Sequence, residues 1–205
     1  MGRKRRLWIP HLFYHIGCRG NRRDPLFRSS SDFDAFFYIL EQLHDEIPFE
    51  IASYCLMTNH FHLQLRSKEE SISKVMSLIN KRYANYYNTR YNLTGHVFEK
   101  RFYDEIIRDR AGMIQVSQYI HFNPVEAMMV GRPEKYKWSS YHHYLTAGKA
   151  SLPKFMNIHS ILDCFDGTIA EKRAMYDQAC YELREIQLNR KAKASLIKKS
   201  AILIQ

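Results

Sequence analysis

The sequence lacks several features that would place it in a membrane, secreted or disulfide-rich class. No stretch approaches the roughly 18 consecutive apolar residues of a membrane span, and no apolar segment follows the basic N-terminus, so we expect no secretory signal. The four cysteines are scattered and form no C-x-x-C pair, which argues against a zinc knuckle and against a disulfide framework. No internal repeat or low-complexity linker is present. We therefore expect a cytoplasmic protein with reduced thiols.

Acidic residues are too few to balance the basic ones, and the net charge is +10. Residues 1–28 carry +7 and residues 184–199 carry +5, so the rest of the chain sums to −2. Two basic ends suit arms that grip a polyanion, and they equally suit solubilising tails. Aromatic residues lie among the arginines of the first segment. This mixture favours nucleic acid, because bases stack on the rings while the cations bind phosphates.

Hydrophobic periodicity predicts an ordered series of strands and helices. Strands are expected at residues 12–18, 49–57, 60–66 and 97–107, where apolar and polar residues alternate or β-formers cluster. Helices are expected from a cap at Ser31 to just before Pro48, over residues 72–90, and from Arg110 to about Phe122. The following residues 123–126 read as a fresh helix start, with Asn as cap, Pro at the first position and Glu at the third.

This order predicts an α+β fold of the ferredoxin-like type, a split β-α-β-β-α-β antiparallel sheet. We expect helices on one face of the sheet and a second face left free for a ligand. Residues 1–145 would form this domain with a basic N-terminal arm. Residues 146–205 would form a mostly helical, basic C-terminal extension, with helix from Thr168 to about Arg190.

Two histidines stand out in the strand at residues 60–66. His60 and His62 project from the same face, opposite Phe61, with Cα atoms about 6.6 Å apart, so both imidazoles can converge on one metal ion. Ordinary surface or core histidines would give the same pattern. Tyr119 falls about 100° from the centre of its helix's apolar stripe, in line with Asn123 one turn later, and amphipathic packing would explain it equally well.

Four blocks in order resemble a known family over about residues 5–145. Met57-Thr58-Asn59-His60-Phe61-His62 is similar to the M-P-N-H-x-H signature of IS200-type transposases, with Thr58 in place of the usual Pro. More specifically, the chain resembles the REP-associated tyrosine transposases in three further blocks: Gly95-His96-Val97-Phe98 with Arg101-Phe102, the run from Tyr119 to Ala127, and Trp138-Ser139-Ser140-Tyr141. Residues 146–205 match no motif.

The resemblance implies the HUH fold and a metal-dependent single-strand DNA endonuclease and strand-transferase. It implies His60, His62 and Asn123 as metal ligands and Tyr119 as nucleophile, although capping of the predicted helix start would compete for the Asn123 oxygen. Mg²⁺ or Mn²⁺ is the metal that the resemblance suggests, whereas ligand softness alone ranks Mn²⁺ or Zn²⁺ above Mg²⁺. The implied partner is single-stranded or hairpin DNA, bound by a monomer or a homodimer.

Further DNA contacts are predicted at Arg3, Lys4, Arg5 and Arg6, which would grip a hairpin, and at Gln64, Arg66 and Arg101. Three other functions remain open at this stage. The protein could be a domesticated, non-catalytic nucleic-acid-binding regulator, or a nuclease in which water attacks while Tyr119 only packs. A purely structural module is disfavoured by the basic ends and by the polar face of the hairpin.

Overall fold

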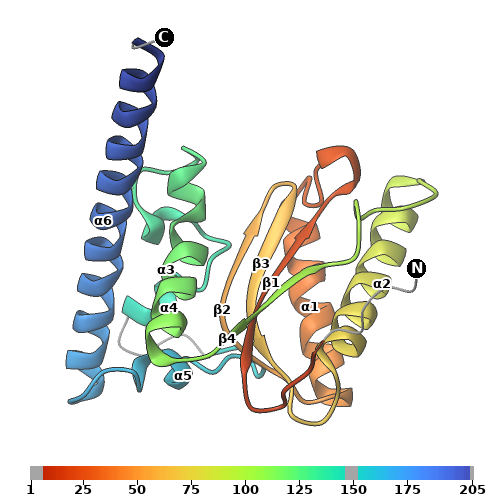
Figure 1. The fold of residues 1–205 in the computed structure, drawn as a ribbon. Helices are drawn as coiled ribbons and strands as arrows, with labels where there is room; N and C mark the ends of the chain where they lie inside the picture. The colour runs from red at the N-terminus through yellow and green to blue at the C-terminus, as the bar shows by residue number, and fades with distance from the viewer. Residues whose placement is uncertain (1–6, 146–151, 204–205) are drawn as a thin grey trace.

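The computed structural model describes residues 7–145 and 152–203 of the chain. Four strands and a series of helices follow one another along it (Figure 1). The elements are β1 (Phe13–Arg19), η1 (Asn21–Arg23), α1 (Ser30–Glu46), β2 (Glu50–Met57), β3 (His60–Arg66), α2 (Ile72–Tyr91), β4 (Tyr103–Ile107), α3 (Arg110–Glu126), η2 (Pro133–Lys135), α4 (Tyr141–Leu145), α5 (His159–Leu162) and α6 (Ile169–Leu203).

The four strands form one antiparallel sheet in the order β2-β3-β1-β4. This order and the helices between the strands confirm the predicted α+β, ferredoxin-like fold. Figure 1 shows three layers: α1 and α2 on one side of the sheet, and α3 with the C-terminal helices on the other. The predicted free face is therefore wrong in part, because α3 packs over β2 and β3 and leaves only part of that face open.

Alternation along β3 determines which side chains meet each helical layer. Phe61 points into the core beside α1, with its ring centroid 4.8 Å from that of Phe36, and it is fully buried. His60 and His62 lie on the opposite face, toward α3. The two-residue turn at Thr58 and Asn59 joins β2 to β3, as the sequence predicts. Both histidines are thus brought to the side of the sheet that faces α3.

Two predicted boundaries differ from the structure. Helix α1 begins at Ser30 and not after Ser31, because Ser29 and Asp32 form a reciprocal capping box. Continuous pairing of β4 begins only at Tyr103, whereas the predicted strand began at residue 97. The segment before Tyr103 is joined to the sheet by single contacts, including a hydrogen bond from Glu99 N to the Arg19 carbonyl of β1 at 3.0 Å. Alternation alone does not distinguish such an irregular edge segment from a strand.

The predicted helix break at Asn123 is also wrong. Helix α3 runs unbroken to Glu126 with Pro124 inside it. Pro124 has no N–H to donate, so α3 loses one backbone hydrogen bond in its last turn and still continues to Glu126. The Asn123 side chain does not cap; its Oδ1 lies 3.3 Å from His60 Nε2. Tertiary contact to β3 has replaced the local capping role.

The C-terminal helix α6 is packed onto the domain. Tyr176 and Cys180 of α6 are fully buried and belong to the main hydrophobic core. In Figure 1, α6 stands beside α3 and α4 and continues past them. It extends from Ile169 to Leu203, beyond the predicted end near Arg190. Within the described part of the chain, no helix is both long and apolar enough to span a membrane.

Candidate active site

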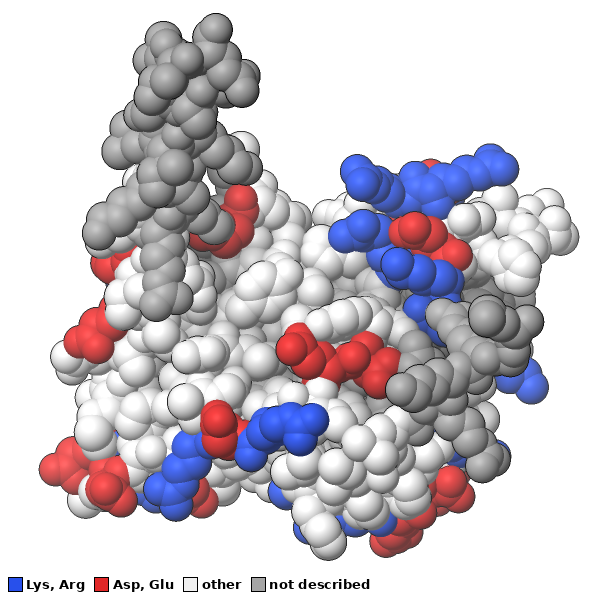
Figure 2. Space-filling model, in the orientation of Figure 1, with Lys and Arg blue, Asp and Glu red and all other residues white. Residues whose placement is uncertain are grey.

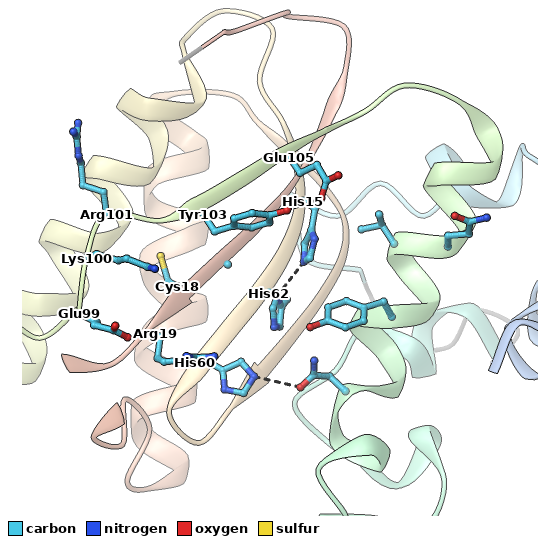
Figure 3. Close-up of a pocket in the computed structure, with 15 residues that line it drawn as sticks. His15, Cys18, Arg19, His60, His62, Glu99, Lys100, Arg101, Tyr103 and Glu105 are labelled. Carbon is cyan, nitrogen blue, oxygen red and sulfur yellow. Dashed lines mark hydrogen bonds between the residues drawn. The ribbon is translucent and has the colours of Figure 1, made fainter. Parts of the chain in front are cut away.

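A cavity of about 690 Å³ opens between the sheet and α3 (Figure 3). β1, β3 and β4 supply its floor, α3 supplies one wall, and the segment before β4 supplies the rim. Its lining includes every residue that the sequence assigns to catalysis or metal binding, namely His60, His62, Tyr119 and Asn123. Two pairs of side chains, one from β3 and one from α3, are thus brought to one place.

His60 lies between two asparagine side chains. Its Nε2 is 3.3 Å from Oδ1 of Asn123 on α3, and its Nδ1 is 2.8 Å from Oδ1 of Asn59 in the β2–β3 turn. The amide nitrogen of Asn59 in turn donates to the backbone carbonyl of Arg23 at 3.1 Å. Contacts from two other segments therefore hold the imidazole of His60 in place.

His62 contacts a histidine that the sequence analysis missed. His15 of β1 lies on the same face of the sheet, and its Nε2 is 3.0 Å from Nδ1 of His62. Figure 3 shows the two rings side by side beneath Glu105. His15 alternates with Gly17 and Arg19 on the cavity face of β1, and that alternation was the available signal. Only the pairing of β1 with β3 reveals its relation to His62.

Tyr119 projects from α3 toward the histidines. Its ring centroid lies 5.4 Å from that of His62 and 5.5 Å from that of His15, both edge-on. The side chain is nevertheless 45% exposed, so its hydroxyl can meet a ligand that enters the cavity. A tyrosine at the margin of the apolar stripe is expected to be partly exposed, so it is the place of Tyr119 in the cavity beside His15 and His62 that favours a functional role.

Burial keeps the histidines of the site neutral. Desolvation lowers the pKa of His62 to about 3, helped by the nearby His15, His60 and Arg19. Burial likewise lowers the pKa of His60 and that of His15, although the charge of Glu105 opposes the shift at His15. Neutral imidazole is the form that binds metal ions. These rings are therefore ready to act as ligands at neutral pH.

The donor set fits a divalent ion. Two ligand atoms at about 2.0–2.2 Å from a shared ion lie about 3 Å apart, and the distance from His60 Nε2 to Asn123 Oδ1 is 3.3 Å. His62 on the same face adds a second imidazole. Among residues 7–145 and 152–203, no group of three or more His, Cys, Asp or Glu side chains is arranged to hold a metal. The candidate set is instead two imidazoles and one amide oxygen, which leaves coordination positions open for a substrate.

The predicted DNA contacts are distributed unevenly. Arg3, Lys4, Arg5 and Arg6 lie outside the described residues. Arg101 is exposed at the rim of the cavity. Arg66 lies outside the cavity, where it pairs with Glu50 at 2.6 Å and stacks on Phe13 at 4.4 Å.

Gln64 corrects the sequence analysis. It is fully buried, accepts a hydrogen bond from Ser53 Oγ at 2.8 Å, and donates to the carbonyl of Met113 at 3.2 Å. Because α3 covers this part of the sheet face and both ends of the amide are engaged, Gln64 is unavailable to DNA.

Positive charge gathers at one end of the face that carries the cavity. Figure 2 shows Lys and Arg side chains clustered over the β1–α1 connection and the segment that precedes β4. Arg19, at the end of β1, lines the cavity together with Lys100 and Arg101 of the segment before β4. An acidic group over β4 lies next to this cluster. A polyanion that followed the basic cluster would be led toward Tyr119.

Taken together, the fold and the site define a ferredoxin-like α+β protein with a paired-histidine strand facing a tyrosine helix. The model of the family described as IS200-like transposases matches residues 9–123, more than half of the chain. The chain belongs to this family. The match covers all of the candidate site, from His15 to Asn123.

The chain is also similar to two REP-associated tyrosine transposases. A REP-associated tyrosine transposase of Haemophilus influenzae is 24% identical over 119 residues, which cover 52% of this chain and 67% of the relative. A solved structure of a REP-associated tyrosine transposase bound to a REP hairpin superposes with a TM-score of 0.62 at 19% identity, covering 77% of this chain and 93% of that one. The resemblance drawn from the sequence motifs is thereby confirmed, and the structural likeness supports the fold.

Proposed function

We propose that this protein is a metal-dependent single-strand DNA endonuclease and strand-transferase that cleaves beside DNA hairpins through a 5′-phosphotyrosine intermediate. One observation carries the proposal. Tyr119, half exposed at the cavity, faces His62 at 5.4 Å, while Asn123 of the same helix meets His60 at 3.3 Å. A nucleophile and a candidate metal-binding set thus share one cavity.

Tyr119 must be activated before it can attack a phosphate. A free phenol has a pKa of about 10 and is a poor nucleophile at neutral pH. A divalent ion, Mg²⁺ or Mn²⁺, held by His60, His62 and Asn123 would polarise a phosphate and stabilise the charge that develops on it. Tyr119 attacks the phosphorus: the phenol loses its proton, a bond from Oη to phosphorus forms, and the bond to the 3′ oxygen breaks. The 3′ oxygen takes up a proton and leaves as a hydroxyl.

Strand transfer follows because the phosphodiester energy is kept in the phosphotyrosine. A second 3′-hydroxyl attacks the same phosphorus, restores the phenol and joins two strands. Neither step consumes a nucleotide cofactor. The cavity, which is open at its rim, leaves room for either strand end to reach Tyr119.

Two observations support DNA as the substrate. Basic residues from separate segments, Arg19, Lys100 and Arg101, line the cavity and would contact phosphates. The structurally similar transposase is bound to a REP hairpin, and we extend that partner to this chain. Exposed aromatic side chains at the cavity, Tyr103 at 50% exposure and Tyr119, could stack on unpaired bases, which favours a single-stranded segment beside the hairpin.

The test uses hairpin DNA with single-stranded flanks, taken from sequence around the gene and labelled at the 5′ or the 3′ end. It is incubated with Mn²⁺, with Mg²⁺ or with a chelator. We expect a covalent adduct on the 5′ end of the downstream fragment, dependent on metal and absent in Tyr119→Phe. Tyr38→Phe, an exposed tyrosine on α1 away from the cavity, is the matched control and should retain the adduct.

Three results would contradict the proposal. Cleavage without an adduct that persists in Tyr119→Phe would make water the nucleophile. An adduct lost in Tyr103→Phe and kept in Tyr119→Phe would move the nucleophile to β4. Tight binding without cleavage of any flanking hairpin would indicate a non-catalytic nucleic-acid-binding regulator.

A further inference from the structure

Each histidine of the candidate metal site has its Nδ1 atom engaged by a protein group. Nδ1 of His60 is 2.8 Å from Oδ1 of Asn59, and Nδ1 of His62 is 3.0 Å from Nε2 of His15. Neither Nδ1 atom is open to an ion. Any metal bound by this histidine pair must therefore meet Nε2 of both rings. Neutral imidazole carries one proton, so Nε2 is a ligand only if that proton is on Nδ1.

The Asn59 amide determines the tautomer of His60. Its nitrogen donates to the backbone carbonyl of Arg23 at 3.1 Å, and a carbonyl can only accept, so the amide cannot be turned over. The oxygen must then face His60. An oxygen accepts, so Nδ1 of His60 must be the donor and carry the proton.

The carbonyl of Arg23 is itself held in place by a tight turn. Arg22 and Arg23 both adopt positive φ angles, 53° and 65°, which are uncommon for residues other than glycine. Gly20 makes the turn possible, because a Cβ at that position would lie 2.2 Å from the carbonyl oxygen of Asp24. The backbone of Gly20 also donates to the Asn59 carbonyl at 2.8 Å. The turn and Asn59 are thus tied together at two points.

The contact on the opposite side of His60 fits a bound cation. With the proton on Nδ1, its bare Nε2 faces the Asn123 oxygen at 3.3 Å, so two acceptors confront each other. A cation between the two atoms satisfies both acceptors.

His15 has the corresponding position beside His62. Its ring is packed edge-on between Tyr103, at 5.8 Å, and Tyr119, at 5.5 Å, so its orientation is held by neighbours on two elements. Nε2 of His15 can accept the Nδ1 proton of His62, and the ring's own proton then sits on its Nδ1. Glu105 pairs with His15 across β1 and β4, and its negative charge favours N–H groups on this imidazole.

We infer that Asn59 and His15 are positioning residues that fix the ring tautomers of His60 and His62, so that both present a bare Nε2 to a divalent cation. The inference rests on the metal site of the proposed function, and it gives a role to Asn59, which directly precedes the His-x-His motif. Partners of this kind orient metal-binding histidines in many proteins, and their loss costs about 10- to 100-fold in metal affinity.

The first test reads the tautomers in the metal-free protein, where no activity is needed. Long-range ¹⁵N–¹H correlation spectra of ¹⁵N-labelled protein at neutral pH report which ring nitrogen carries the proton. We expect the Nδ1–H form for both His60 and His62. The Nε2–H form at either ring, or averaged shifts from exchanging tautomers, would overturn the inference.

The second test measures Mn²⁺ affinity by electron paramagnetic resonance. Asn59→Ala and His15→Phe, which remove the acceptors, should weaken binding by about 10- to 100-fold. His15→Gln places an acceptor oxygen near the former Nε2 and should restore most of the affinity. Asn59→Asp keeps the oxygen toward His60 but loses the bond to the Arg23 carbonyl, so it should restore only part of the affinity. Asn88→Ala, which removes an asparagine bond to the Gly95 carbonyl on the far side of the domain, is the matched control.

Equal losses in the removing and restoring variants would contradict a positioning role. The two proposals also fail separately. If the tautomers and the Mn²⁺ affinities are as predicted but no DNA adduct forms, the nuclease assignment is contradicted and the positioning role of Asn59 and His15 is kept. If a Tyr119 adduct forms but the histidines are in the Nε2–H form, the nuclease assignment is kept and the positioning role is contradicted.

Discussion

His121 lies on α3 between Tyr119 and Asn123 and points away from the cavity, into a buried network. Its Nδ1 is 2.7 Å from the Tyr176 hydroxyl of α6, and its Nε2 is 2.7 Å from Ser140 Oγ. The Ser140 oxygen also accepts from the backbone N–H of Tyr54 on β2 at 2.8 Å. This network fixes α3 from behind, against both the sheet and α6. We predict that His121→Phe destabilises the protein in a way that depends on pH.

The magnitude follows from two terms. Two buried hydrogen bonds are lost, at about 1 kcal/mol each, so the variant should be less stable than wild type by about 2 kcal/mol near pH 8. Complete burial, with His142 and His143 nearby, lowers the pKa of His121 to about 3, against about 6.5 in the unfolded chain. Below pH 6.5 the unfolded state thus binds one more proton, and the wild type loses about 1.4 kcal/mol per pH unit.

The variant lacks this titration, so its deficit should shrink by about 2 kcal/mol between pH 8 and pH 5, and the two stability curves should meet near pH 5. Urea unfolding followed by circular dichroism across this range measures both curves. Other buried histidines, His62 included, affect the two proteins alike and cancel in the difference. His44→Phe removes a half-buried histidine ring away from the network and is the matched control. Parallel curves for wild type and His121→Phe would refute the assignment of His121 as a buried neutral residue.

Two further predictions concern the DNA contacts. Replacing Arg3–Arg6 with Ala should weaken binding of hairpin DNA and flatten its salt dependence, because each lost phosphate contact makes the negative slope of log K against log salt shallower by about 0.9. An unchanged slope in filter binding would show that the arm is not part of the DNA interface. Gln64→Leu should leave DNA affinity intact and lower the free energy of unfolding by about 1–3 kcal/mol, since Ser53 and the Met113 carbonyl lose a buried partner. A loss of affinity at unchanged stability would restore Gln64 as a DNA contact.

Local pattern predicted most of the fold. The period of two along β3 placed His60 and His62 on one face, and turn residues marked the hairpin, because both signals depend only on neighbours in the sequence. His15 was missed for the opposite reason. It is 47 residues from His62, and only the pairing of β1 with β3 makes them partners. Strand order is a tertiary property, which a single sequence expresses weakly.

The two errors at the site have a common cause. Alternation assigns Gln64 to the polar face but does not say which helix covers that part of the face. Likewise, Asn-Pro is a strong local signal for a helix start at Asn123, but the contact with His60 and the packing of α3 outweigh it. Burial of a whole helix against a sheet involves more free energy than one cap, so the local preference yields.

Packing of α3 along β3 explains why the tyrosine meets the histidines. Met113 of α3 lies on Gln64 and Asn123 lies on His60, so the helix runs antiparallel to the strand. Ten helical residues span about 15 Å, and four strand residues span about 13 Å, so the two elements stay in step between these contacts. Tyr119 falls between the two ends, as His62 does on β3. Removing one residue between Met113 and Tyr119 would turn the tyrosine by about 100° around α3 and away from the cavity, even with every side chain of the site retained.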